Sequence, residues 1–198
     1  FEQQVIVHQL YGTPPRQLIQ PEERPKISDA YRWIMENTER TQRIIDDVLD
    51  CVQQLKHPII LTERREHAES INAVLLEKGI DSVLLKGAMR AAERKTTEER
   101  LPSAQVVVAT GKYVGEGFDL PRLDTLFLAM PIAWKGSLAQ YAGRINRESD
   151  GKEQVTIHDY VDCSLSMLQR MFNKREKSYK AMGYRLEFSG ALESGIEK

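Results

Sequence analysis

Val106-Val107-Val108-Ala109 is an uninterrupted apolar run near the middle of the chain. A short run of β-branched residues without polar alternation is typical of a strand that is covered on both faces of a parallel sheet. Outward from this run, further short apolar segments predict strands at 58–61, 80–85, 123–130 and 155–160. The sequence therefore favours a parallel sheet as the centre of the fold.

Helical patterns separate the predicted strands. They cover 28–55 (one long helix, or two with a break near Thr38), 64–78, 89–100, 137–145 and 164–182. Gly79 and Gly183 stand where two of these helices should end. The regular exchange of strand and helix predicts an α/β fold, a three-layer parallel sheet with helices on both faces.

The two ends of the chain show less regular patterns. Residues 1–27 read as a linker, because prolines break any regular element after Val5-Ile6-Val7, which could form a short strand. We expect the domain proper over 28–185 and a loose tail over 186–198, where apolar residues are few. Because the chain begins at Phe1 rather than Met, we expect it to be a piece of a longer protein.

The 198 residues are 41% hydrophobic and 29% charged, which indicates a globular domain rather than a disordered chain. The net charge of −1 excludes a wholly basic nucleic-acid binder but leaves a local basic face open. No membrane-length apolar segment or signal peptide is visible, so we expect no membrane partner. Cys51 and Cys163 lack the spacing of a zinc site, which favours reduced thiols in an intracellular, cytoplasmic protein.

Two glycine patterns fail as phosphate-binding motifs. Gly111-Lys112 is not a phosphate loop, because Val106 stands where a glycine is required and Tyr113 replaces Ser or Thr. The pair Gly115 and Gly117 is not a dinucleotide fingerprint, because Leu120 replaces the third glycine. The sequence therefore holds no recognisable cradle for a triphosphate.

Residues 140–147 read Gln-Tyr-Ala-Gly-Arg-Ile-Asn-Arg and end a predicted helix. Their two arginines, Arg144 and Arg147, are three positions apart and should project from the same side. Such a pair of guanidinium groups suits a phosphate group. The alternative is a pair of surface arginines that bind Glu148 or Asp150.

A glycine-rich segment follows the central apolar strand, from Ala109 to Pro121. Loops at the carboxyl ends of parallel strands are where open α/β sheets bind ligands. Gly115 and Gly117 would let the backbone approach a ligand closely. Asp119 could accept a ribose hydroxyl or orient a cation, or it could simply form a turn.

Together these segments resemble the second, C-terminal RecA-like domain of superfamily 2 helicases and translocases, over about residues 28–185. The similar segments are Pro58 to Arg64 (motif IV), Leu84 to Gly87 with Glu93-Arg94, Gly111 to Asp119 (motif V) and Gln140 to Arg147 (motif VI). One departure is that Gly111 occupies a motif V position often held by Ser or Thr, with Thr110 one residue early.

The resemblance implies that ATP and Mg²⁺ are held mainly by a first, N-terminal RecA-like domain that is absent from this chain. Arg144 and Arg147 would then be the catalytic arginine fingers. The implied nucleotide contacts are Gln140, Gly115, Gly117 and Asp119. The expected contacts to DNA or RNA are Thr62, Arg64, Lys86, Gly87, Thr110 and Lys112, together with Trp134, whose indole could stack on a base or pack between layers.

Two further groups of polar residues have open or structural interpretations. The last predicted helix is basic and could follow phosphates or form a solvated face; its cations include Arg170, Lys174, Arg175, Lys177 and Lys180. His158, Asp159 and Asp162 have no nucleophile suggested beside them, and we interpret them as structural.

We therefore expect the C-terminal motor domain of an ATP-dependent, nucleic-acid-stimulated helicase or translocase, catalytically silent by itself. A restriction-type or remodelling-type translocase that does not separate strands would have the same motifs. The alternative from another class is a non-catalytic α/β module that docks a protein partner.

Overall fold

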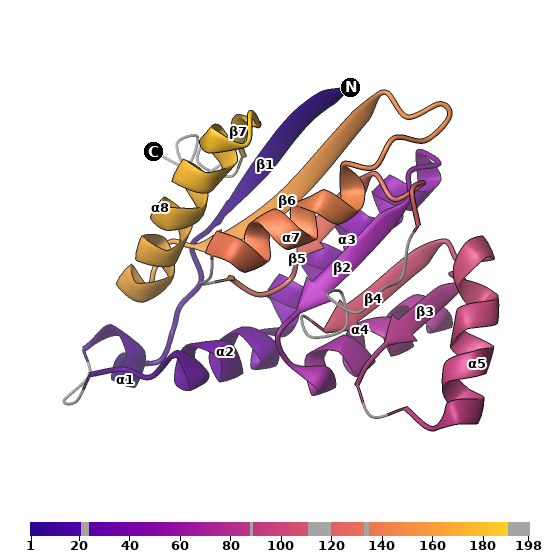
Figure 1. Cartoon of the computed structure of the whole chain (residues 1–198). Coiled ribbons are helices and arrows are strands. Elements are labelled where there is room, and N and C mark those ends of the chain that lie inside the picture. Colours follow the sequence, from indigo (N-terminus) through magenta and orange to yellow (C-terminus); the bar gives the residue numbers. More distant parts are fainter. Residues whose placement is uncertain (21–23, 88, 111–119, 133–134, 190–198) are drawn as a thin grey trace.

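The computed structural model describes residues 1–20, 24–87, 89–110, 120–132 and 135–189 (Figure 1). Within these ranges seven parallel strands form one sheet, in the order β3-β4-β2-β5-β6-β1-β7. The strands are β1 (Glu2–Leu10), β2 (Pro58–Thr62), β3 (Ser82–Leu85), β4 (Val106–Thr110), β5 (Thr125–Leu128), β6 (Gln154–Asp162) and β7 (Arg185–Ser189). The helices are α1 (Arg16–Ile19), α2 (Ile27–Glu36), α3 (Thr38–Gln53), α4 (Arg65–Glu77), α5 (Ala91–Arg100), η1 (Leu101–Ser103), α7 (Lys135–Ile145) and α8 (Ser166–Ala181).

Helices cover both faces of the sheet, as the uninterrupted apolar strands predict (Figure 1). On one face, Ile59 and Leu61 of β2 belong to the same core cluster as Leu138 of α7. On the other face, Ile60 packs in a cluster with Ile44 of α3 and Ile71 of α4. Successive residues of a strand point to opposite faces, so a strand between two helical layers must be apolar throughout. The predicted three-layer α/β fold is confirmed.

The helices end where their capping residues stand. The sequence allowed one long helix or two helices over 28–55, and the structure has two. Asn37 separates α2 from α3, and its side chain accepts a hydrogen bond from the Arg40 N–H at 3.2 Å. Gly79 and Gly183, which follow α4 and α8, have φ values of 79° and 88°. This left-handed backbone is easy for glycine and ends a helix, as the sequence predicts.

The first strand corrects the expectation that residues 1–27 are a linker. β1 lies inside the sheet, hydrogen-bonded to β6 on one side and β7 on the other, and Val5 and Val7 are fully buried. The sheet of this domain therefore includes a strand that lies before residue 28. The polar residues of β1, such as Gln3 and Gln4, make this strand difficult to recognise in the sequence, although Val5-Ile6-Val7 marks its centre.

The tail expected from residue 186 also begins later. Residues Arg185–Ser189 form β7, an edge strand whose Leu186 is paired with Val5 of β1. An edge strand with most of its surface in solvent needs few apolar residues, so composition alone does not reveal it. The rest of the expected tail, 190–198, lies outside the described residues.

A buried ion pair joins α8 to β6. The Arg175 Nε and Nη2 atoms donate to the two oxygens of Asp159 at 2.8 and 2.9 Å, and these side chains are only 3% and 1% exposed. The Tyr179 hydroxyl donates to the same carboxylate at 2.6 Å. Arg175 is therefore not part of a solvated basic face, because α8 turns it towards the sheet. The structural interpretation of Asp159 is confirmed.

A second buried ion pair lies on the opposite face of the sheet. The Arg40 Nε atom donates to Asp162 at 2.9 Å, and the Arg40 guanidinium also donates to the carbonyl oxygens of Ala129 and Tyr160. Both side chains are nearly fully buried. Arg40 thus binds α3 to the carboxyl ends of β5 and β6, and the structural interpretation of Asp162 is also confirmed.

Three of the four histidines are held neutral inside the fold. His8 and His158 face each other across β1 and β6, with 2.8 Å between His8 Nε2 and His158 Nδ1. Burial lowers the pKa of His8 to about 4 and that of His158 to about 3. Burial also lowers the pKa of His67, beside Thr62, to about 4. All three must lose their protons when the chain folds at mildly acid pH.

We predict that the free energy of unfolding falls between pH 6.5 and pH 5. In this window the unfolded histidines bind protons while the three folded histidines do not, so acid favours the unfolded state. The expected loss is about 2 kcal/mol per histidine. Urea unfolding at a series of pH values measures it. His67→Gln should reduce this dependence on pH, because it removes one of the three buried imidazoles. A flat profile would contradict the prediction.

Candidate nucleotide and nucleic-acid contacts

Helix α7 presents the predicted nucleotide-binding side chains away from the core. Its Leu138, Ala142 and Ile145 are fully buried in the sheet-facing cluster. Gln140 and Arg144 lie four residues apart on the other side of the helix; Gln140 is exposed and Arg144 is partly exposed. Arg147 follows the end of the helix and is exposed. Gln140 and Arg144 therefore share the outer side of α7, and Arg147 comes two residues after the helix ends.

Lys152 fixes the backbone at the end of α7, a role that the sequence analysis missed. Its Nζ atom donates hydrogen bonds to the carbonyl oxygens of Pro121 at 2.7 Å, Ile145 at 2.9 Å, and Arg147. The ammonium group thus caps the carboxyl end of the helix and joins it to the turn before β5. A lysine shortly after a helix end is the only sequence signal for such a cap.

Most of the predicted nucleic-acid contacts lie at one edge of the sheet. Thr62 and Thr110 are register partners at the carboxyl ends of β2 and β4. Lys86 directly follows Leu85, which is paired with Ala109, so it lies at the same edge on β3. Arg64 and Gly87 come just after these strand ends and are exposed. We call these five residues, Thr62, Arg64, Lys86, Gly87 and Thr110, the carboxyl edge.

The side chains of the carboxyl edge differ in how they are held. The Thr62 hydroxyl is buried and lies 2.9 Å from His67 Nδ1, where it supports the turn into α4. Lys86 lies between two carboxylates, 3.8 Å from Glu69 and 3.6 Å from Glu93. The Arg64 guanidinium carbon lies 5.5 Å from the centre of the Tyr31 ring. Arg64 and Lys86 are the cations at this edge, and acidic neighbours offset Lys86.

The remaining predicted residues lie outside the described part of the chain. They are Lys112, Gly115, Gly117, Asp119 and Trp134. The strand that leads into the first four ends at Thr110, and the chain is described again from Leu120.

Comparison with known proteins identifies the family. Residues 40–149, from α3 to just beyond Arg147, match the family described as Helicase conserved C-terminal domain. The chain belongs to this family. The match spans both the carboxyl edge and α7, which confirms the family predicted from the motifs.

Relatives of this helicase C-terminal domain occur in viruses. The domain is 23% identical over 158 residues to the transcript termination protein A18 of fowlpox virus, covering 78% of this chain and 34% of that protein. It is 36% identical over 81 residues to the putative helicase 161L of invertebrate iridescent virus 6, covering 41% of this chain and 17% of that protein. This domain therefore spans about a third or less of these two relatives' lengths.

Solved helicase structures share the fold. T4 UvsW superposes with a TM-score of 0.72 at 14% identity, covering 94% of this chain and 41% of that one. The C-terminal domain of the DEAD-box protein Dbp5 gives 0.64 at 14% identity, covering 94% and 89%. The helicase C-terminal domain described here is thus RecA-like, as expected.

The described residues of this domain contain no group of three or more His, Cys, Asp or Glu side chains that could hold a metal ion. None of their helices has the length and apolar content that a bilayer crossing requires. Cys51 and Cys163 are both free thiols.

Proposed function

We propose that this chain is the C-terminal motor domain of an ATP-dependent, nucleic-acid-stimulated helicase or translocase. The observation that carries the proposal is the outer side of α7, which presents Gln140 and Arg144 and leads to the exposed Arg147, in a domain of the helicase family. Family membership supports the reaction class, and the exposed side of α7 supports the part that this domain plays in it.

The nucleotide is ATP with Mg²⁺, bound mainly by a first RecA-like domain outside this chain. The side chains here fit phosphate rather than metal, since guanidinium groups donate to phosphate oxygens in a planar fork. Arg144 and Arg147 stabilise the negative charge that spreads over the γ-phosphate oxygens in the transition state. Gln140 orients the nucleotide, and Gly115, Gly117 and Asp119 complete the contacts at the domain interface.

The nucleic acid, DNA or RNA, lies across the carboxyl edge. Arg64, Lys86, Gly87 and Thr110 contact its phosphates, together with Lys112, and Trp134 stacks on a base. The Thr62 hydroxyl acts through the turn that it holds with His67. A related fold has been solved as S. cerevisiae Dbp5 bound to RNA and ADP BeF3, with a TM-score of 0.60 at 12% identity. The two contact regions lie on different elements of one domain, which would link ATP binding to strand binding.

Within this class, one comparison favours a motor that acts on a transcript. The relative from fowlpox virus, which matches 78% of this chain, is named a transcript termination protein.

The chain alone should fold but should not hydrolyse ATP, with or without nucleic acid. Arginine fingers stabilise a transition state only when another group holds the nucleotide and its metal. Steady-state phosphate release by the purified chain measures this, and a circular-dichroism melt checks that it is folded. The Arg147→Ala variant serves as a control for contaminating ATPase. If the parental chain hydrolyses ATP rapidly and Arg147→Ala abolishes this activity, the two-domain mechanism is wrong.

A further inference from the structure

A pocket lies between α1 and α2, apart from both contact regions described above. Its volume is about 720 Å³, and its lining includes Arg16, Arg24, Lys26, Arg32 and Trp33. Both helices follow the carboxyl end of β1, so the pocket belongs to the same edge of the sheet as the strand ends that carry Thr62, Lys86 and Thr110.

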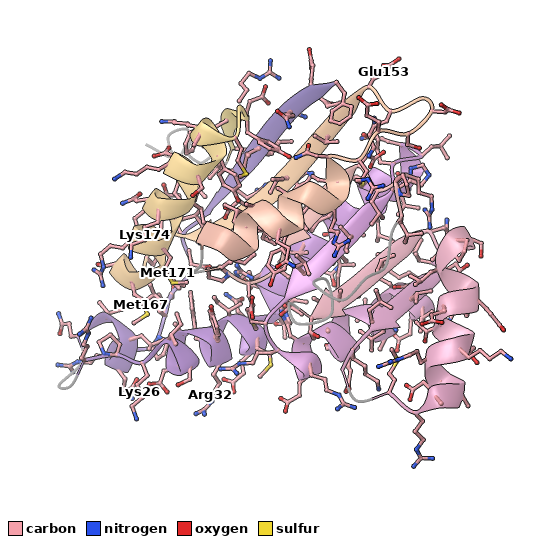
Figure 2. The ribbon with its side chains drawn as sticks, viewed as in Figure 1. Lys26, Arg32, Glu153, Met167, Met171 and Lys174 are labelled. Atoms are coloured by element: carbon pink, nitrogen blue, oxygen red, sulfur yellow. The ribbon has the colours of Figure 1, made fainter. Side chains whose placement is uncertain are left out.

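The charge of the pocket favours an anionic ligand. Among the lining residues that the structure describes, four cations, Arg16, Arg24, Lys26 and Arg32, exceed two carboxylates, Asp29 and Glu36. Arg32 is three and four residues from these carboxylates along α2, yet none of the four cations forms an ion pair with a residue in the described ranges. Figure 2 shows Lys26 and Arg32 directed away from the sheet, on the outer side of α2. Cations gathered in a concave surface raise the local concentration of anions.

Trp33 gives the same pocket an aromatic surface. The indole is partly exposed, and it packs closely on the backbone of Gly12: a Cβ atom at that position would lie 3.3 Å from its Cζ2 atom. Gly12 therefore allows the ring to lie against the chain and still line the pocket. An aromatic ring beside a row of cations is the combination that binds single-stranded nucleic acid, because bases stack on the ring while cations bind phosphates.

Helix α2 connects this pocket to the carboxyl edge. The Tyr31 hydroxyl donates to the Pro131 carbonyl oxygen at 2.9 Å, which anchors α2 beside the loop before α7. The Tyr31 ring lies under Arg64 of the carboxyl edge, at 5.5 Å. The ten residues of α2 span about 15 Å, a distance that two or three nucleotides of an extended strand can cover.

We propose that the α1–α2 pocket is a second nucleic-acid site, which binds two or more phosphates and one stacked base of the single strand that leaves the carboxyl edge. This proposal rests on the proposed function, because it extends the nucleic-acid path of the motor domain. Arg16, Arg24, Lys26 and Arg32 bind the phosphates, and Trp33 stacks on the base.

Binding of single strands of two lengths to the purified chain tests the proposal. Fluorescence anisotropy is measured with labelled oligonucleotides of about 6 and about 20 nucleotides at several salt concentrations. The Lys26→Gln/Arg32→Gln variant should weaken binding of the long strand about 10- to 30-fold near 0.1 M salt and reduce its salt slope by about 1.4. The short strand, which reaches only the carboxyl edge, should bind as before. Trp33→Leu should weaken the long strand without changing the salt slope.

Matched variants separate this proposal from the proposed function. Lys56→Gln/Lys78→Gln removes the same charge at the opposite edge of the sheet, where both side chains are exposed, and should change binding little. Arg64→Gln/Lys86→Gln should weaken both strands. If only Arg64→Gln/Lys86→Gln weakens binding of the long strand, the pocket proposal is wrong, and the proposed nucleic-acid contact at the carboxyl edge is retained. If no variant lowers binding of either strand, both proposals fail. If the Lys26→Gln/Arg32→Gln variant weakens binding of the long strand but Trp33→Leu does not, base stacking in the pocket is refuted. The pocket would then be a site for a protein or another polyanion.

Discussion

In the protein that carries both RecA-like domains, Arg147→Lys is expected to lower nucleic-acid-stimulated ATP turnover by about 10³- to 10⁵-fold. The charge of this side chain matters most as the γ-phosphate departs, so the affinity for ATP should change far less than the turnover. Lysine keeps one positive charge but loses the planar fork that donates two hydrogen bonds at once. Steady-state ATPase at saturating nucleic acid, with a nucleotide-binding titration of the same variant, measures the two effects separately.

Folding should survive this exchange, because Arg147 is exposed and lies beyond the last residue of α7. A thermal melt of the variant checks this. Arg170→Lys, the same exchange at an exposed arginine of α8, is the matched control and should leave turnover unchanged. A variant at Arg147 that melts normally and turns over at the parental rate would refute the finger assignment. A variant that unfolds would instead assign Arg147 a structural role.

The largest expected effect on stability comes from Asp159→Ala. The carboxylate accepts hydrogen bonds from Arg175 Nε and Nη2 and from the Tyr179 hydroxyl, all within 2.9 Å. Its removal would leave the Arg175 charge buried without compensation, which typically costs about 3–5 kcal/mol. Urea unfolding of the purified chain measures the loss. For comparison, Glu176→Ala breaks a partly exposed pair with Lys180 at 4.0 Å and should cost less than about 1 kcal/mol.

A double replacement shows whether the loss of stability comes from the unpaired buried charge of Arg175 or from the lost contacts of Asp159. If the penalty arises from the unpaired guanidinium, Arg175→Met in the Asp159→Leu background should recover much of the stability, because an apolar pair often replaces a buried ion pair at little cost. The coupling energy of the double-mutant cycle should then be large. A loss below about 1 kcal/mol for Asp159→Ala would contradict the prediction.

The sequence predicts the inner strands well because both of their faces are buried. Val106-Val107-Val108-Ala109 must be apolar throughout, and such a run is visible without any structure. β1 and β7 carry many polar residues, and their stability comes from partners far along the chain, so local pattern reveals only Val5-Ile6-Val7. Boundaries of the domain are therefore harder to predict than its centre.

The position of Arg175 could not be predicted from the pattern of charges alone. It lies among the lysines and arginines of α8, and by composition it belongs to a basic face. The spacing of the buried residues Leu168, Phe172 and Tyr179 places it on the apolar side of the helix instead, which is the signal that could have found it. Its partner, Asp159, lies on another element, and only the packing of α8 on β6 brings the two together.

Parts of the candidate site were predictable for a different reason. Gln140 and Arg144 stand four residues apart in α7, so their shared side follows from helical spacing in the sequence. Lys152 was not predictable in the same way, because its three acceptors are backbone carbonyl groups, which any residue provides. Nor could the sequence place the α1–α2 pocket, which depends on the packing of two short elements beside β1.

The place of β1 in the sheet constrains how the chain can be made. β1 leaves the ribosome before the rest of the domain, but both strands that pair with it come last, since Val5 is opposite Ile157 and Leu186. At typical rates of synthesis it waits roughly 10–40 s for these partners. The strands from β2 to β5 can associate during this time, while Val5-Ile6-Val7 remains an unpaired apolar segment open to contact with other chains. Newly made molecules should therefore depend on chaperones during synthesis, until β6 and β7 enclose the first strand.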